Sequence, residues 1–186
     1  MERSLPDLSI LICSLYNRGR VRGRLLTLLE SQPPELLARC QIVVDIDGGE
    51  VTIGAKRNRL LDASVGKYIV FIDDDDTITK TYLARIFEGI DLGVDHIGVG
   101  MLYCPFDASP QLVECSMKHD WTHAGTKFLR PPQHTCAVKA NLARFVGFDD
   151  ISFGEDRSYA ERLKPLIETE YVVKEPIYIY QYDARK

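Results

Sequence analysis

Short apolar runs alternate with segments of helical spacing along the first ninety residues of the chain. The first run, 8–15, is continuously apolar, as is typical of a strand buried on both faces of a sheet. The second and third strands are predicted at 41–47 and 67–73. The segments that follow them have helical spacing and cover 22–32, 54–64 and 80–88. Strand and helix in this order predict right-handed crossovers and a parallel sheet.

The second half of the chain has a less regular pattern. Strands are predicted at 96–103, 111–118 and 170–182, and helices at 139–146 and 155–166. Residues 119–135 have no clear periodicity and are expected to be irregular. We therefore expect one α/β domain over 1–186, with a mainly parallel central sheet flanked by helices and a mixed C-terminal part.

Composition narrows the class of protein. The 186 residues suit one domain, and 45% hydrophobic with 27% charged residues excludes a disordered chain. A net charge of −4 gives no overall basic field for nucleic acid, and the four arginines between Arg18 and Arg24 are expected to form a solvated helix face. No apolar run reaches the roughly 20 residues of a membrane span.

Cysteine usage and the N-terminus indicate a compartment. The five cysteines are an odd number, widely spaced and without a C-x-x-C pair, which suits reduced thiols. The first ten residues, MERSLPDLSI, lack the apolar core of a signal peptide. We therefore expect a cytoplasmic protein.

Four consecutive aspartates, Asp73 to Asp76, follow the third apolar run. Two like charges about 4 Å apart repel by roughly 1 kcal/mol in water and by several times that near a protein surface. Folding gains nothing from this crowding unless a positive group lies among the carboxylates. In open α/β sheets, ligands bind beyond the carboxyl ends of the parallel strands, which is where this run is expected.

A divalent cation would account for the aspartates. Clustered carboxylates favour Mg²⁺ or Mn²⁺, and such ions keep open positions for water and a diphosphate. Asp73 and Asp75 are the expected working pair, because alternate side chains of an extended segment point the same way. The alternative is a solvated acidic turn at the end of a strand.

The chain resembles the family 2 glycosyltransferases of the GT-A fold in four segments: LSILICSLYNR, DIDGG, GAKRNRLLDASVGKYIVFIDDDD and GFDDISFGEDRSYAERL. The third is the most specific, because it matches the part G-x-Y-I-x-F-x-D-x-D-D of the family pattern. The first departs from the family, since LICSLYN is one residue longer than the usual I-P-T-Y-N. Ser14 or Leu15 is expected to replace the threonine contact.

The resemblance implies a donor site for a nucleoside diphosphate sugar, with uracil as the family's usual base. Asp47 would contact the nucleobase, and Tyr16 would line it. Asp73 would hold the ribose. Arg57, or Lys56 beside it, would approach the phosphates.

The same resemblance implies a metal and a base. Asp75 would bind Mn²⁺ or Mg²⁺ on the diphosphate, with His134 or His123 as a further ligand. Asp156 would be the general base that deprotonates an acceptor hydroxyl for in-line attack with inversion. Residues 1–95 would then bind the nucleotide sugar, and 96–186 the acceptor. The resemblance does not identify the acceptor, because a saccharide, a lipid-linked sugar, a protein side chain or a hydroxylated nucleobase would each need the same base.

Two other functions remain open from the residues. The segment VFIDDDDTI also matches the nucleophile strand of haloacid-dehalogenase phosphatases, with Asp73 attacking phosphate and Asp75 as acid and base. That motif normally lies on the first strand of its domain, whereas here two strands precede it. A non-catalytic metal- or nucleotide-binding module is the other alternative, in which Asp156 would only complement the dipole of its helix.

Overall fold

The structure of the protein is a computed structural model that describes residues 5–106 and 108–182. Its first half alternates strands and helices as predicted. The elements are β1 (Leu8–Leu15), α1 (Gly19–Glu30), β2 (Cys40–Asp47), α3 (Ile53–Ala63), β3 (Tyr68–Phe71) and α4 (Tyr82–Asp91). A 3-10 turn (Tyr16–Arg18) leads into α1, and a short α2 (Pro34–Leu37) follows it.

The second half adds short strands around a long one. Its elements are β4 (Thr77–Ile78), β5 (His96–Pro105), β6 (Gln111–Cys115), β7 (Thr122–Ala124), β8 (Lys127–Arg130), β9 (Ala137–Lys139), α5 (Ala140–Val146), α6 (Glu155–Leu163) and β10 (Glu170–Tyr182). The expectation of irregular chain over 119–135 was wrong, because β7 and β8 pair as an antiparallel hairpin there. Strands of three and four residues are too short to leave a period in the sequence.

The strands form a mixed sheet in the order β2-β1-β3-β9-β5-β6-β8-β7. Strands β2, β1 and β3 are parallel, whereas β9 runs antiparallel between β3 and β5. The last strand, β10, lies parallel to β5 and also pairs with β4. The expected parallel sheet with a mixed C-terminal part is thereby confirmed.

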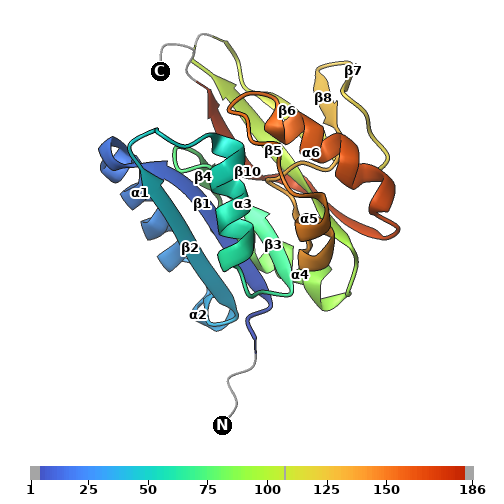
Figure 1. Ribbon diagram of the computed structural model, residues 1–186. Helices are drawn as coiled ribbons and strands as arrows, with labels where there is room; N and C mark the ends of the chain where they lie inside the picture. Colours follow the sequence, from blue (N-terminus) through green and yellow to red (C-terminus); the bar gives the residue numbers. More distant parts are fainter. Residues whose placement is uncertain (1–4, 107, 183–186) are drawn as a thin grey trace.

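Helices cover both faces of the sheet. Figure 1 shows α3, α5 and α6 together on the face turned to the viewer. Alternate residues of β1 separate the two cores, because successive strand side chains point to opposite faces. Ile10 and Ile12 pack into the core that includes α1 and α4, whereas Leu11 and Cys13 pack into the core of α3, α5 and α6.

The parallel strands bring three polar strand ends to one edge. Leu15 at the end of β1 pairs with Asp47 at the end of β2, and Leu11 pairs with Phe71 at the end of β3. The aspartates of 73–76 therefore leave the sheet beside the end of β1. This edge is where an α/β sheet places its ligands.

One glycine fixes the distance between α3 and the loop that leads to α6. The amide of Gly54 donates to the carbonyl of Ile151 at 3.0 Å. A Cβ on Gly54 would lie 1.8 Å from the carbonyl oxygen of Asp149. The first turn of α3 can therefore approach this loop only because residue 54 has no side chain.

We expect Gly54→Ala to destabilise the protein by about 1–3 kcal/mol, because the backbone of 149–151 would have to move. Gly23→Ala is the matched control, since a Cβ there meets nothing within 4 Å in the exposed face of α1. That change should stabilise by about 0.5–1 kcal/mol through helix propensity. Urea unfolding measures both, and equal effects of the two substitutions would contradict the close approach.

Candidate active site

The four aspartates alternate between buried and accessible positions. The side chains of Asp73 and Asp75 keep 34% and 19% of their surface exposed. Asp74 and Asp76 are buried, at 1% and 4%. Two of the four carboxylates are therefore accessible, in alternation with two that are buried.

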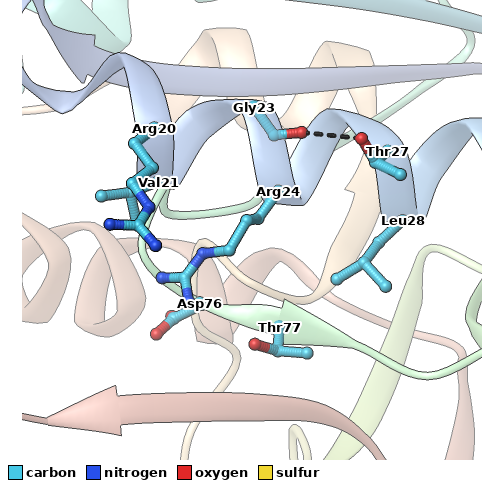
Figure 2. A pocket seen from close by; sticks show the side chains of 8 residues that line it. All are labelled: Arg20, Val21, Gly23, Arg24, Thr27, Leu28, Asp76 and Thr77. Atoms are coloured by element: carbon cyan, nitrogen blue, oxygen red, sulfur yellow. Dashed lines mark hydrogen bonds between the residues drawn. The ribbon is translucent and has the colours of Figure 1, made fainter.

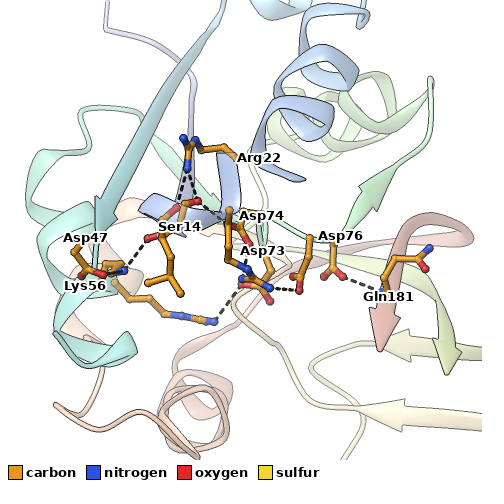
Figure 3. Close-up of polar contacts among 12 residues, drawn as sticks. Ser14, Arg22, Asp47, Lys56, Asp73, Asp74, Asp76 and Gln181 are labelled. Carbon is orange, nitrogen blue, oxygen red and sulfur yellow. Dashed lines mark hydrogen bonds and ion pairs between the residues drawn. The ribbon is translucent and has the colours of Figure 1, made fainter. Parts of the chain in front are cut away.

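Asp74 ties the turn to the end of β1. Its carboxylate accepts hydrogen bonds from the Ser14 hydroxyl and from Arg18, each at 2.6 Å. A second nitrogen of Arg18 pairs with Asp75. Arg22 donates to the Ser14 hydroxyl at 2.8 Å, so two arginines of the basic run face the aspartates (Figure 3). The prediction that this run is only a solvated helix face was wrong for Arg18 and Arg22.

Asp76 ties the same turn to the last strand. It accepts hydrogen bonds from the Tyr178 hydroxyl at 2.6 Å and from the amide of Gln181 at 2.9 Å (Figure 3). Burial, together with the nearby charge of Asp73, raises the pKa of Asp76 to about 8. A carboxyl that is largely protonated at neutral pH reduces the repulsion within the turn.

Asp73 lies among positive and polar groups. Arg57 lies 3.4 Å from one carboxylate oxygen, and His134 Nε2 lies 3.5 Å from the other. Its amide donates to the Tyr178 hydroxyl at 3.2 Å. Burial alone would raise the pKa of Asp73, but the hydrogen bond with His134 and the charges of Arg57 and Arg18 hold it well below its usual range.

Arg57 connects the edge that carries the aspartates with α6. Its guanidinium is 3.4 Å from Asp73 and 3.7 Å from Glu155, and its side chain is almost completely buried. The same group lies over the rings of Phe71 and Phe148, at 5.5 and 5.3 Å from their centroids. An arginine held in this way is a fixed positive charge rather than an exposed helix residue.

Asp156 lies in the first turn of α6, after Gly154 in a left-handed conformation (φ 82°). One of its carboxylate oxygens accepts the amide of Arg157 at 2.8 Å. The side chain lines a cavity of about 150 Å³ together with Arg57, Asp73 and His134. The structure therefore brings the expected base to the group of residues expected to hold the donor.

A second, adjoining cavity lies between the aspartates and the end of β10. Its volume is about 270 Å³, and its walls include Asp73, Asp75 and Arg18. Arg57, Asp73 and Tyr180 line both cavities. The two spaces are therefore adjacent, one over the accessible aspartates and one in front of Asp156.

Asp47 and Tyr16 lie further along the edge, outside the linings of these two cavities. Asp47 is buried and accepts hydrogen bonds from Lys56 Nζ at 2.6 Å and from the amide of Gly49 at 2.9 Å. Burial would raise its pKa, but these two bonds hold it below its usual range. Tyr16 is 70% exposed. Its ring lies 3.8 Å from where a Cβ on Gly48 would be.

The largest cavity near the aspartates lies on the opposite side of Asp76, against α1. It measures about 710 Å³, and Figure 2 shows Arg20 and Arg24 extending from the helix towards Asp76 and Thr77. Within residues 5–106 and 108–182, neither arginine has an ion pair. Asp76 separates this groove from the cavity in front of Asp156, since it lines both.

The carboxylates suit a divalent cation only in part. Asp73 and Asp75 supply the oxygen donors that Mg²⁺ and Mn²⁺ prefer, at the wall of one cavity. No group of three metal-binding side chains occurs in the described part of the chain. His134 lies beside Asp73, and the rest of a coordination shell would have to come from water and a diphosphate.

None of the helices within the described ranges is long and apolar enough to cross a membrane.

Arg18 and Arg22 are the site residues that the sequence analysis missed. Arg18 ends the 3-10 turn after β1, and Arg22 lies in the first turn of α1. Their place directly after the carboxyl end of a buried strand was the available signal. The prediction of a solvated helix face rested on the arginine-rich composition alone, whereas the contacts of these two side chains depend on their position beside the aspartates.

We expect Lys56→Met to destabilise the protein by about 3–5 kcal/mol, because Asp47 would stay buried without its partner. Arg59→Met is the matched control. Arg59 also pairs with Asp47, at 3.5 Å, but half of its side chain is exposed. Its loss should cost less than about 1 kcal/mol. Thermal and urea unfolding measure both, and similar losses would show that the Asp47–Lys56 pair is not the stabilising contact.

The comparison with known families gives one match. The family described as Glycosyl transferase family 2 matches residues 36–151. Asp47, Arg57 and the aspartates lie within the matched residues, whereas Tyr16 and Asp156 lie outside them. A search of curated protein sequences finds no significant match.

Solved structures with the same fold extend beyond the matched residues. TarS of S. aureus, in a crystal structure of its residues 1–349 in complex with UDP-GlcNAc, superposes with a TM-score of 0.69 at 16% identity. The mannosyltransferase PcManGT of Pyrobaculum calidifontis, in complex with GDP-Man and Mn²⁺, superposes with a TM-score of 0.65 at 15% identity. These alignments cover 95% and 98% of this chain, but only 59% of each of those chains. The GT-A fold is thereby confirmed.

Proposed function

Because the chain belongs to glycosyl transferase family 2, we propose that it transfers a sugar from a nucleoside diphosphate sugar to an acceptor hydroxyl, with inversion at the anomeric carbon. One observation carries the proposal. Two accessible aspartates at a strand edge and a third carboxylate at a helix N-terminus line adjoining cavities that share Arg57 and Asp73. A transferase needs a donor site and a base close to each other, one on each side of the reacting carbon.

The donor would lie along the edge formed by β2, β1 and β3. We place the nucleobase beside Tyr16 and Asp47, and the ribose at Asp73. The diphosphate would lie in the cavity of about 270 Å³ next to Asp75, where Arg18 and Arg57 supply positive charge. Residues 1–95 then bind the donor, and residues 96–186 bring the base and the acceptor.

A divalent cation fits this arrangement through Asp75, with Asp73 and His134 nearby. When bound, the ion would offset the negative charge that develops on the leaving diphosphate. In the protein alone, Arg18 pairs with both Asp74 and Asp75. A cation therefore competes with a guanidinium for Asp75, and the incoming diphosphate gives that guanidinium an alternative anion.

Asp156 would remove the proton of the acceptor hydroxyl as its oxygen forms the new bond to the anomeric carbon. The bond from that carbon to the diphosphate oxygen breaks on the opposite face, and the nucleoside diphosphate leaves with the electron pair. Arg57 pairs with Glu155, the neighbour of Asp156, and so helps to fix the first turn of α6. The base is therefore oriented by the same arginine that contacts Asp73.

The alternatives lose support. In a haloacid-dehalogenase phosphatase the nucleophile would be Asp73, but here it follows the third strand of a chain that belongs to another family. A non-catalytic module remains the second candidate, and the effect of replacing Asp156 distinguishes it from the transferase.

The cysteines of the described residues are all free thiols, which supports a reducing, cytoplasmic location.

We expect one nucleoside diphosphate to bind only when Mn²⁺ or Mg²⁺ is present. Calorimetric titration of UDP, GDP, CDP, ADP and dTDP, each with and without metal, identifies the base. Asp75→Ala should abolish the metal-dependent part of the affinity, because it removes a ligand of the ion. Asp150→Ala is the control, since that exposed aspartate lies outside both cavities. Binding that is indifferent to metal and to Asp75 would exclude the proposed metal site.

Asp156→Asn should lower the rate of transfer by a factor of about 10²–10⁴, the usual contribution of a general base, while nucleotide binding changes little. The substitution keeps the shape of the side chain and its acceptor for the Arg157 amide. Transfer and donor affinity are measured on the same preparation. A loss of both, or of neither, would remove Asp156 as the base and favour the non-catalytic module.

A further inference from the structure

Four aromatic rings continue outward from the proposed transfer site. They come from β5, β8 and β10, and we call them the aromatic platform: Tyr103, Phe128, Tyr180 and Tyr182. Tyr103 is the central ring, with centroids 5.5 Å from Tyr180, 5.8 Å from Tyr182 and 6.0 Å from Phe128. Tyr180 and Tyr182 also contact each other, at 6.1 Å. The four side chains therefore form one connected surface.

The inner end of the platform belongs to the site. Tyr180 lines both the cavity over the accessible aspartates and the cavity in front of Asp156. Tyr182 lines the first of these. The platform therefore begins between the proposed donor and the proposed base, which is where an acceptor has to enter.

The outer end approaches α6 again. Arg130 lies over the ring of Phe128 at 4.8 Å and over that of Trp121 at 5.3 Å. Arg157, the neighbour of Asp156, also lies near this tryptophan, 5.7 Å from the Trp121 centroid. Rings and guanidinium planes thus extend from Tyr180 back to the residue beside Asp156.

The platform rings are accessible and amphipathic. Tyr180 and Tyr182 are 38% and 43% exposed, and Tyr103 and Phe128 are half-buried. Within the described residues, the hydroxyls of Tyr103, Tyr180 and Tyr182 have no hydrogen-bond partner in the protein. A core aromatic would bury its ring and pair its hydroxyl, as Tyr178 does with Asp76.

We propose that this aromatic platform binds a saccharide acceptor, whose terminal hydroxyl passes Tyr180 to reach Asp156. A pyranose has a face of C–H bonds that packs on aromatic rings and a rim of hydroxyls that pair with phenol groups, and the platform offers both. The four rings carry no charge, and the guanidinium groups of Arg130 and Arg157 lie only at their outer end, so the rings themselves suit the C–H face of a neutral sugar. The proposal rests on the proposed function and specifies its acceptor class.

The test uses the full chain and direct binding. Neutral oligosaccharides of glucose, N-acetylglucosamine, galactose, mannose and rhamnose, three to five units long, are screened on an array with Mn²⁺ and the nucleotide that binds. Saturation-transfer NMR and calorimetry then measure the strongest binder. We expect Tyr182→Ala and Phe128→Ala each to weaken saccharide binding about tenfold, or about 1.4 kcal/mol. Phe128→Ala should also leave nucleotide affinity unchanged, because Phe128 lines neither of the two cavities of the transfer site.

Two control variants locate the effect. Phe145→Ala removes an aromatic ring of α5 that is 80% exposed and not part of the platform, and it should leave binding unchanged. Replacing Arg20 and Arg24 with alanine alters the groove of Figure 2 and should likewise have no effect on a neutral saccharide. Circular dichroism and nucleotide affinity show that each variant is folded.

The outcomes separate the platform from the transferase function. Saccharide binding that depends on the platform, in a protein that binds no nucleotide, would support the platform and overturn the proposed function. Nucleotide binding and slow donor hydrolysis, with no oligosaccharide bound, would keep the function and overturn the platform. The platform is also overturned if Tyr182→Ala and Phe128→Ala bind saccharide as the wild type does, or if binding needs Arg20 and Arg24.

Discussion

The repulsion among four adjacent carboxylates is the constraint that the rest of the site has to satisfy. In the turn at 73–76 every carboxylate has a compensating partner: Arg57 and His134 lie beside Asp73, Arg18 pairs with both Asp74 and Asp75, and Tyr178 donates to Asp76. These partners come from α3, from the segment before β9, from the turn after β1 and from β10. Charge compensation therefore fixes distant parts of the chain around one turn.

The first half of the fold was largely predictable from the sequence. Strands β1 and β3 are buried, β2 is half-buried at the edge of the sheet, and the strand ends near Asp47 and Asp73 are visible as changes from apolar to polar residues. Parallel pairing then brings these ends together. The order of the C-terminal strands was not predictable, because β9 and the β7–β8 hairpin are shorter than any periodicity and depend on long-range pairing.

The role of a site residue was predictable where its residue type indicates a single function. It was less predictable where the role depends on which residues the side chain contacts. A pair of alternate aspartates after a buried strand indicates a cation site, and Asp73 and Asp75 do face the cavities. Nothing in the sequence distinguishes Arg18, which pairs with the aspartates, from Arg20, which has no ion pair in the described chain.

Arg57 joins the two halves of the proposed reaction in one side chain. It contacts Asp73 on the donor side and Glu155 on the helix of the base, and it is too deeply buried to relax towards water. Burial raises the pKa of Glu155, and the nearby guanidinium of Arg57 opposes that rise. In the proposed reaction, the fixed charge that a donor phosphate would meet beside Asp73 is therefore the same charge that holds Glu155, the neighbour of Asp156.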